Sequence, residues 1–396
     1  MKKKKKIIIT LSFLLFILLF ISVYLYFTNT EDLILKKDIS INFRAKAYNS
    51  DLIEKINGRL LNDPLIDTNT IGKKKVQITY YNHYGFIENK YAEVEIKDVT
   101  PPMIVVNNPY VIEKGSISKL EDNIFCTDDY DDNVSCQITG DYNLNKVGKY
   151  PLKITATDHS NNVTSKSFTL QVKNKETPTT KPIDTKNYFK DIYQKYKKTN
   201  TLIGIDISKW QGDIDFNKIK EEGAEFVMIK IGGQTKKGGK IEVDPKFKQN
   251  ITSALAANLK VGIYFYSHAT NIKEARNQAK WVLKNISEYE ITLPIAFDWE
   301  NWSKYSTYHI SIHSLNNIAN TFFTTLEQKN YKTILYSSKY YLENIWYEEE
   351  YSNWIAHYTL DDKNKNRYDM WQLCSDGVIE GIEEKVDIDI LYKHEK

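Results

Sequence analysis

The chain has 396 residues, a length typical of two or three domains, and with 41% hydrophobic residues it can bury a core. Its formal net charge is +3, but Lys2–Lys6 supply five positive charges, so the rest of the chain is slightly acidic. Nucleic acid is therefore excluded as the expected partner, because phosphate binding needs a concentrated basic face. Three cysteines are too few for a disulfide-rich scaffold, and the seven histidines show no metal-ligand spacing. We expect neither a metal nor a cofactor.

The N-terminus combines basic residues 1–6 with a long apolar run. Residues 7–27 carry no charge, and as a helix they would be about 31 Å long, which matches a hydrocarbon core of roughly 30 Å. The lysines favour the cytoplasmic side. We therefore expect a cytoplasmic tail, a transmembrane helix and a single-pass protein of the cell membrane, with the remaining chain on the wall side. A cleaved signal peptide is the alternative, although the run is long and lacks an A-x-A cleavage pattern.

Two segments in the middle of the chain resemble each other. Residues 65–98 align with residues 140–174, and both show alternating apolar and polar residues on either side of a polar turn. This pattern predicts a strand, a turn and a strand near the end of a small antiparallel sandwich. The second copy resembles bacterial immunoglobulin-like modules, so we expect two such all-β domains, over residues 37–98 and 99–174. A linker rich in Pro, Thr and Lys is expected over residues 175–200, with a short helix at its end.

Cys126 and Cys136 lie ten residues apart in the second repeat. A disulfide between them is expected because disulfides persist outside the cytoplasm, although two reduced structural cysteines fit the same spacing. The sequence DDYDD lies between them at residues 128–132. A calcium site needs about six to eight oxygen ligands, so a solvated acidic turn is the favoured interpretation of these aspartates.

From residue 201 onward, short apolar runs alternate with helical stretches. Strands that alternate with helices indicate a parallel sheet, and eight such strands indicate a closed barrel, here irregular because the late helices are short. The predicted fold class is multidomain. It comprises the N-terminal transmembrane helix, the two all-β immunoglobulin-like sandwiches and a C-terminal irregular (β/α) TIM-like barrel over residues 201–396.

Carboxylates follow several of the expected strands, at the end of the barrel where such folds place their sites. They are Asp206, Asp298 with Glu300, and Asp387. On an extended strand Asp298 and Glu300 face the same way, with their Cα atoms roughly 6.6 Å apart. Two carboxyls at this reach can flank one glycosidic bond, and burial and repulsion would leave one of them protonated. Surface turns also carry this spacing, but here it ends the buried apolar run PIAFDWE.

Six segments occur in the order typical of the glycoside hydrolase family 25 lysozymes, which this part of the chain resembles. They are GIDISKWQGDIDF (204–216), DPKFKQNI (244–251), VGIYFYSHA (261–269), LPIAFDWE (293–300), NWIAHY (353–358) and MWQLCSDGVIEGIEEKVDIDILY (370–392). The resemblance implies an irregular (β/α) barrel. It also implies an N-acetylmuramidase that hydrolyses the β-1,4 bond between N-acetylmuramic acid and N-acetylglucosamine, with peptidoglycan as the partner.

The same resemblance implies a role for each carboxylate. Glu300 would be the general acid, and Asp298 would orient the 2-acetamido group of the substrate, which attacks the anomeric carbon and leads to net retention. Asp206 and Asp387 would hold the substrate and tune the other two groups. Four aromatic residues would line the sugar groove, although core packing is an alternative for each: Tyr264, Tyr266, Trp354 and Trp371.

The sequence therefore predicts a monomeric, membrane-anchored peptidoglycan hydrolase. The alternative is a non-catalytic cell-surface protein that binds glycan or mediates adhesion. The intact pair of Asp298 and Glu300 favours the enzyme, because a protein that only binds glycan has no need to keep both carboxyls.

Overall fold

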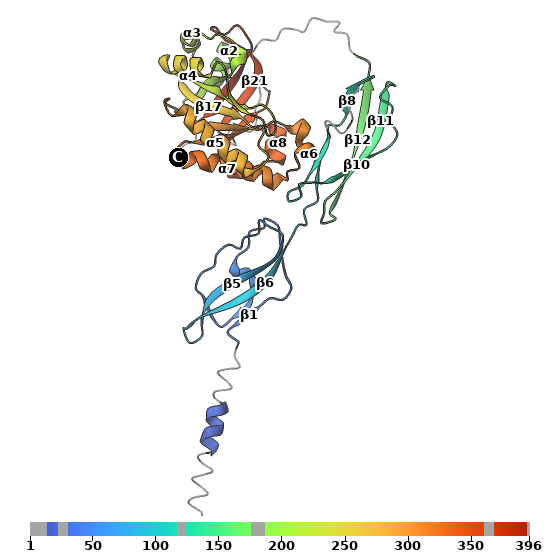
Figure 1. Ribbon diagram of the computed structural model, residues 1–396, viewed down its shortest axis with the longest axis vertical. Helices are drawn as coiled ribbons and strands as arrows, with labels where there is room; N and C mark the ends of the chain where they lie inside the picture. Colours follow the sequence, from blue (N-terminus) through green and yellow to red (C-terminus); the bar gives the residue numbers. More distant parts are fainter. Residues whose placement is uncertain are drawn as a thin grey trace, which may run out of the picture. The chain divides into compact units, whose positions relative to one another are not determined.

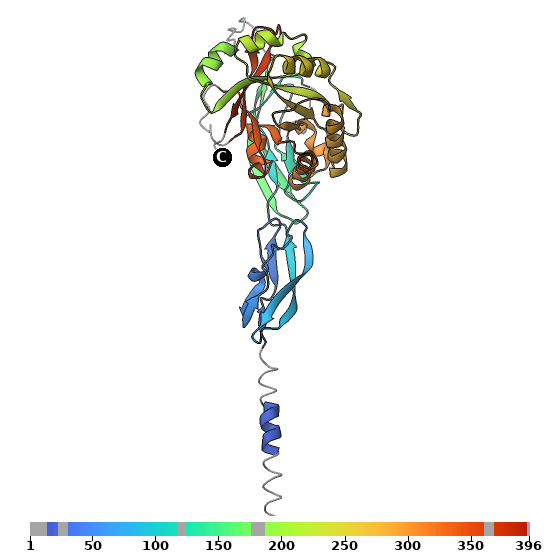
Figure 2. The ribbon, with the colours of Figure 1, turned by 90° about the vertical axis from the view of Figure 1, so that its left-hand side faces the viewer.

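The computed structural model describes residues 14–22, 31–116, 120, 124–175, 187–359 and 368–393. The chain divides into two compact units, Met1–Thr100 and Pro101–Lys396, and each is described here by itself. Figures 1 and 2 show the strands and helices of both units, coloured along the sequence. The finer domain boundaries expected from the sequence remain predictions.

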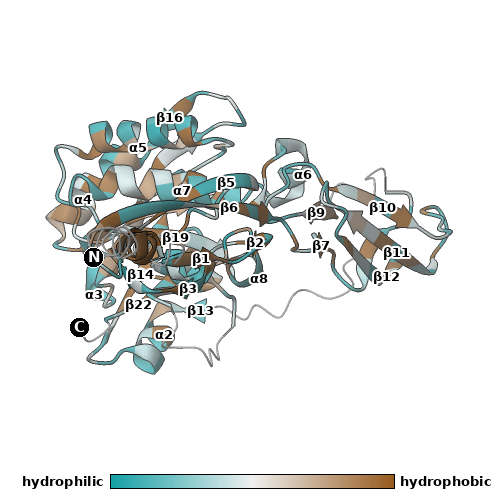
Figure 3. Cartoon of the chain, turned by 90° about the horizontal axis from the view of Figure 1, so that it is seen from below, coloured by the Kyte–Doolittle hydropathy of each residue, from teal (hydrophilic) through white to brown (hydrophobic). Residues whose placement is uncertain are grey.

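The described part of the N-terminus is a helix over residues 14–22, and Figure 3 shows that it is strongly hydrophobic. Within the described ranges, no helix is long and apolar enough to cross a membrane. The predicted transmembrane helix over residues 7–27 and the single-pass localisation in the cell membrane are therefore wrong on this finding. Residues 1–13 and 23–30 lie outside the described residues.

The first unit contains a four-stranded and a two-stranded sheet. Its strands are β1 (Leu33–Leu35), β2 (Ile39–Asn42), β3 (Ile53–Ile56), β4 (Gly58–Leu60), β5 (Gly72–Asn82) and β6 (Ile87–Lys97). The larger sheet has the order β2-β6-β5-β4, and β1 pairs with β3. The long hairpin of β5 and β6 buries alternate residues, including Ile78 and Val94, which is the pattern of a sheet with one solvated face.

The second unit begins with a module of the same plan. Its strands are β7 (Met103–Val105), β8 (Tyr110–Glu113), β9 (Phe125–Thr127), β10 (Ser135–Thr139), β11 (Gly148–Thr157) and β12 (Val163–Lys173). The larger sheet has the order β10-β11-β12-β8, and β7 pairs with β9. A disulfide joins Cys126 on β9 to Cys136 on β10, with an S–S distance of 2.08 Å.

The sheets of these two modules show that the predicted pair of immunoglobulin-like sandwiches is wrong. An immunoglobulin-like sandwich packs two antiparallel sheets of several strands each against each other. Here each four-stranded sheet contains a parallel pair, β2 with β6 and β8 with β12, and the other described sheet of each module has only two short strands. The alternating pattern predicted the hairpins correctly. It could not predict the second sheet, because a period of two residues identifies a strand and not its partners.

The C-terminal domain is a β/α fold built around one large sheet. Its strands are β13 (Asn187–Tyr188), β14 (Thr201–Ile207), β15 (Phe226–Gln234), β16 (Ile241–Val243), β17 (Lys260–Tyr266), β18 (Ile295–Asp298), β19 (Thr333–Ser338), β20 (Asn353–Ala356), β21 (Met370–Val378) and β22 (Val386–Tyr392). Its helices are α2 (Phe189–Tyr196), α3 (Phe216–Glu221), α4 (Phe247–Ala256), α5 (Ile272–Ile286), α6 (Tyr305–Tyr308), α7 (Ile312–Glu327) and α8 (Lys339–Asn344). Helix α2 is the short helix that was expected at the end of the linker.

The sheet closes on itself through its last strand. Its strand order is β21-β20-β19-β18-β17-β15-β14-β22, and β22 also pairs with β21. β22 runs antiparallel to both of its neighbours, β14 and β21, whereas the pairs from β14 to β21 along the ring are parallel. The closed sheet is thus not the all-parallel arrangement of a TIM barrel. We call it the closed sheet below.

Side chains alternate between the inside and the outside of the closed sheet. An apolar cluster, to which Leu202, Met228 and Met370 belong, fills one part of the interior. Outward residues such as Phe265 and Phe297 pack against the surrounding helices. Phe265 on β17 contacts Trp281 of α5 and Phe322 of α7, with ring centroids 5.8 and 5.9 Å apart. This apolar layer holds the strands in register, so the strand ends can carry polar residues.

We predict that Phe265→Ala lowers the free energy of unfolding of this domain by about 3–5 kcal/mol, because the lost ring leaves a cavity between the sheet and two helices. Denaturant titration followed by tryptophan fluorescence measures the change. Phe86→Ala is the control, since this side chain in the first unit is 69% exposed and should change stability by less than about 0.5 kcal/mol. Equal effects of the two substitutions would contradict the proposed packing.

Candidate active site

A cavity of about 400 Å³ opens where β14 and β18 end, and it contains most of the site residues predicted from the sequence. The predicted residues on its wall are Asp206, Tyr264, Tyr266, Asp298, Glu300, Trp354 and Asp387. The wall also contains Ser208, Trp210, Gln211, Lys230, Tyr336, Tyr358, Gln372 and Ser375, which the sequence analysis did not identify. Two larger cavities, of about 790 and 810 Å³, contain none of the predicted residues. We therefore take the smaller cavity as the candidate site.

The topology explains why residues from distant segments meet here. Asp206 is the next-to-last residue of β14, and Asp298 is the last residue of β18. Because β22 is antiparallel to β14, its first residues lie beside the end of β14, and Asp387 pairs in register with Asp206. The carboxylates of the first, middle and last strands are thus brought to one edge of the closed sheet.

Asp298 and Glu300 face the cavity from either side of Trp299. Trp299 is fully buried, donates to the carbonyl of Ala269 over 3.1 Å and packs edge-on against Trp302. Asp298 is itself buried, whereas Glu300 lies at the open rim. The buried indole therefore anchors the short segment that presents both carboxyls.

The electrostatic environment raises the pKa of both carboxyls of this pair. For Asp298 the main cause is burial and the second is the charge of Glu300. For Glu300 the main cause is again loss of water, because surrounding protein atoms crowd it even though it reaches solvent. A pair that repels in this way keeps a shared proton to a higher pH than two isolated carboxyls would.

Lys230 is the one cation among the described wall residues, and the sequence analysis missed it. Its Nζ lies 4.8 Å from the ring centroid of Tyr266 and 5.8 Å from that of Tyr264. Its charge acts to lower the pKa of Asp298 and of Glu300, against the effect of burial. The sequence signal was present, since this lysine interrupts the apolar run FVMIKIG.

A second acidic cluster consists of Asp206, Asp387 and Asp389. Burial raises the pKa of all three, and their mutual repulsion raises it further; the pKa of Asp387 reaches about 8. Asp389 is completely buried and accepts a 2.9 Å hydrogen bond from Nε1 of Trp354. The analysis missed Asp389, although its spacing of two residues from Asp387 on one strand indicates the same face.

The predicted aromatic residues separate into two groups. Tyr264, Tyr266 and Trp354 line the cavity, and Trp354 packs edge-on against Tyr264. Trp371 does not line it. Trp371 faces the outside of the closed sheet, where it packs edge-on against Tyr196 and donates to the carbonyl of His357 over 2.8 Å. For Trp371 the structure thus shows the core packing that was the alternative.

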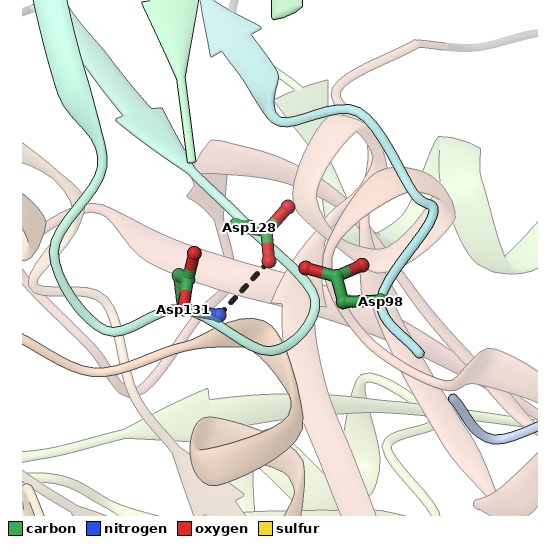
Figure 4. A group of neighbouring side chains, drawn as sticks. All are labelled: Asp98, Asp128 and Asp131. Atoms are coloured by element: carbon green, nitrogen blue, oxygen red, sulfur yellow. Dashed lines mark hydrogen bonds between the residues drawn. The ribbon is translucent and has the colours of Figure 1, made fainter. Parts of the chain in front are cut away.

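The acidic turn between the two cysteines lies in the second β module. Figure 4 shows Asp128 and Asp131 in this turn, with a hydrogen bond from the backbone N–H of Asp131 to the carboxylate of Asp128. The same Oδ1 of Asp128 accepts from the backbone N–H of Tyr130 over 2.8 Å. This carboxylate oxygen therefore stabilises the turn itself.

The C-terminal domain is similar in sequence to known proteins. Residues 205–382 match the family model described as glycosyl hydrolases family 25. The autolytic lysozyme of Clostridium acetobutylicum is 29% identical over 189 residues, which are 47% of this chain and 54% of that protein. Lysozyme M1 of Streptomyces globisporus is 24% identical over 207 residues, which are 48% of this chain and 67% of that protein. The chain thus spans about half the length of the autolytic lysozyme.

A solved structure of a family 25 glycosyl hydrolase from Bacillus anthracis is similar over 50% of this chain and 93% of its own length, at 22% identity and a TM-score of 0.43. The assignment rests on the sequence matches. They show that the C-terminal domain is a glycoside hydrolase of the lysozyme type. Residues 205–382 are thus similar to the glycosyl hydrolases of family 25.

We predict that the stability of this domain falls as the pH rises from 5 to 9. The pKa of Asp387 is raised from 3.8 to about 8 in the folded chain, so the folded chain holds a proton that the unfolded chain releases. The stabilisation is present at low pH and is lost as the pH rises through 8. Asp387→Asn should remove this loss and stabilise the domain at pH 9 by at least about 1.4 kcal/mol, which corresponds to one pKa unit.

Thermal unfolding at several pH values measures this dependence. Asp213→Asn is the matched control, because Asp213 is exposed and its hydrogen bond with Lys246 lowers its pKa. Asp213 is ionised in both states above pH 5, so its removal should leave the slope unchanged. Identical slopes for wild type and Asp387→Asn would contradict the proposed protonation.

Proposed function

We propose that the chain is a peptidoglycan hydrolase that cleaves the β-1,4 bond between N-acetylmuramic acid and N-acetylglucosamine with net retention. The observation that carries this proposal is the pair of Asp298 and Glu300 on the wall of one cavity, both with a raised pKa, in a domain that matches lysozymes. In this proposal residues 201–396 form the catalytic domain.

Glu300 is the proposed general acid. Its position at the rim lets it reach the glycosidic oxygen of a bound glycan, and its raised pKa keeps the carboxyl protonated to a higher pH than that of an isolated glutamate. The proton passes to the leaving oxygen while the bond between that oxygen and the anomeric carbon breaks. The resulting carboxylate then takes a proton from water, which attacks the same carbon.

Asp298 is the proposed partner of the substrate's acetamido group. Its Oδ1 is buried and accepts no hydrogen bond from any residue in the described part of the chain, so the amide N–H of a substrate would satisfy it. The acetamido oxygen attacks the anomeric carbon and forms a cyclic intermediate, which water later opens. Two inversions at one carbon return the β configuration.

The proton of the pair must lie on Glu300 when the glycan is bound. In the free chain, burial raises the pKa of Asp298 and favours a proton there. A donated amide N–H favours the ionised form of Asp298, whereas the charge of Lys230 lowers the pKa of both carboxyls and does not choose between them. Substrate binding would therefore move the shared proton to Glu300, where the acid is needed.

Aromatic side chains of the wall suit the apolar faces of sugar rings. Trp210 lines the cavity and is 71% exposed, and Tyr358 on the same wall is 59% exposed. Because these exposed rings lie on the wall of the cavity, their faces are available to a bound glycan. We propose that they contact sugars next to the cleaved bond.

We predict that Glu300→Gln lowers the rate of wall hydrolysis by about 10²–10⁴, because glutamine keeps the shape but cannot donate the proton. Incubation of the full chain with purified cell walls, followed by mass spectrometry of released muropeptides, measures this rate. Glu242→Gln is the control, since Glu242 is exposed on β16 and does not line the cavity. Full activity of Glu300→Gln, or glycan binding by wild type without any cleavage, would refute the assignment.

We further predict that muropeptides lacking the N-acetyl group on the cleaved muramic residue are very poor substrates. The amine of these substrates cannot form the cyclic intermediate. On the normal substrate, Asp298→Asn should slow the reaction, because it removes the negative charge that balances the positive charge of the transition state. NMR of the first product should show the β anomer. An α anomer would exclude both double-displacement routes, and an enzyme–sugar adduct on Asp298 in mass spectra would favour a covalent nucleophile.

A further inference from the structure

Gln372 is buried in the wall of the candidate site and makes three side-chain hydrogen bonds. Its Nε2 donates to Oδ2 of Asp206 over 2.8 Å. Its Oε1 accepts from the hydroxyls of Tyr336 and Tyr358 over 2.9 and 3.0 Å. The side chain is 3% exposed, so water cannot readily replace any of these partners. One amide thus connects three of the cavity's polar groups.

The two ends of this amide are not interchangeable. Nε2 can only donate and Oε1 can only accept, so the observed orientation requires Asp206 to accept and both tyrosines to donate. With the amide reversed, Oε1 would face Asp206, and this contact would need a proton on the carboxyl. The orientation of Gln372 and the protonation of Asp206 are therefore linked.

This arrangement also determines what the two tyrosines can offer to a ligand. Each hydroxyl proton points to Gln372, so only oxygen lone pairs remain for the cavity, and the oxygen of Tyr358 also interacts with the hydroxyl of Ser375. The carboxyl groups of the wall also present acceptor oxygens, and Lys230 is the one cation among the described wall residues. A ligand rich in O–H and N–H donors, such as an amino sugar, matches this wall.

We propose that Gln372 is a positioning residue, which favours the ionised form of Asp206 against the surrounding carboxyls and turns the hydroxyls of Tyr336 and Tyr358 into acceptors for the donor groups of the bound sugar. This inference rests on the proposed function. Gln372 acts through its neighbours and is not itself a catalytic residue. Trp371, the adjacent residue on β21, faces the opposite side of the sheet and has no part in this network.

Several titratable groups interact electrostatically with Asp206. They are Tyr264 on β17, Asp298 on β18, Glu300 beyond it, Tyr336 on β19, and Asp387 and Asp389 on β22. All of the carboxylates disfavour a second charge at Asp206, and burial acts in the same direction. The hydrogen bond from Gln372 opposes them by stabilising the ionised form.

The decisive experiment is an NMR titration of ¹³C-labelled aspartate carboxyls in the full chain, with Asp206→Asn used to assign the resonance. In Gln372→Met the apparent pKa of Asp206 should rise by about one unit or more, because the N–H donor is lost. Gln278→Met is the matched control, since Gln278 is equally buried and hydrogen-bonded to Ser267 and Gln234 outside the cavity. An unchanged titration in folded Gln372→Met, or an equal shift in the control, overturns the proposal.

A second measurement uses kcat/KM on solubilised peptidoglycan across pH. Gln372→Met should move the acid limb of the profile to higher pH by the same amount as the titration, which a loss of packing alone would not do. Tyr358→Phe should raise KM in the wild-type background and add little in Gln372→Met, because that hydroxyl is then free to turn. Additive effects of these two substitutions overturn the proposed coupling.

Folding and function are kept apart in this design. Tyr358 is largely exposed, so Tyr358→Phe remains informative if Gln372→Met does not fold. The NMR titration needs no turnover. A wild-type chain that fails to cleave peptidoglycan would refute the proposed function, whereas the titration would still decide whether Gln372 controls the charge on Asp206.

Discussion

The candidate site depends on the repulsion between carboxyl groups held close together away from water. Four of them line a cavity of about 400 Å³, and Asp389 lies beneath them. Burial raises the pKa of all five carboxyls, and repulsion from neighbouring carboxyls raises it further for the four aspartates, so the folded chain holds protons that an unfolded chain would release. The apolar layer between the closed sheet and its helices must hold these carboxyls together, because the repulsion between them favours their separation.

A positively charged group and neutral hydrogen-bond donors offset part of the repulsion between these carboxyls. Lys230 acts on Asp298 and Glu300, whereas Gln372 and Trp354 donate hydrogen bonds to Asp206 and Asp389. The cavity therefore has two differently stabilised halves. One half has a cation beside the proposed catalytic pair, and the other has neutral donors beside carboxyls that share protons. This asymmetry gives chemically identical carboxyls different roles.

The sequence predicted the elements that local patterns specify. Asp298 and Glu300 could be found because their spacing ends a buried run, and the alternation of strands and helices indicated a β/α domain. Local patterns could not show which face of β21 meets the cavity, so Trp371 was chosen and the adjacent Gln372 was missed. Lys230 and Asp389 were missed because their partners come from distant strands. The membrane helix was predicted from hydropathy and length alone, and no helix among the described residues is long and apolar enough to cross a membrane.

The closure of the sheet by β22 has a consequence for how the protein is made. Residues 386–392 lie between β14, the first strand of the ring, and β21. A nascent chain that has not reached these residues has neither a closed ring nor the carboxyls of Asp387 and Asp389. The cavity is therefore completed only when the last strand emerges and pairs with the first. A partly made chain therefore lacks the complete cavity described here.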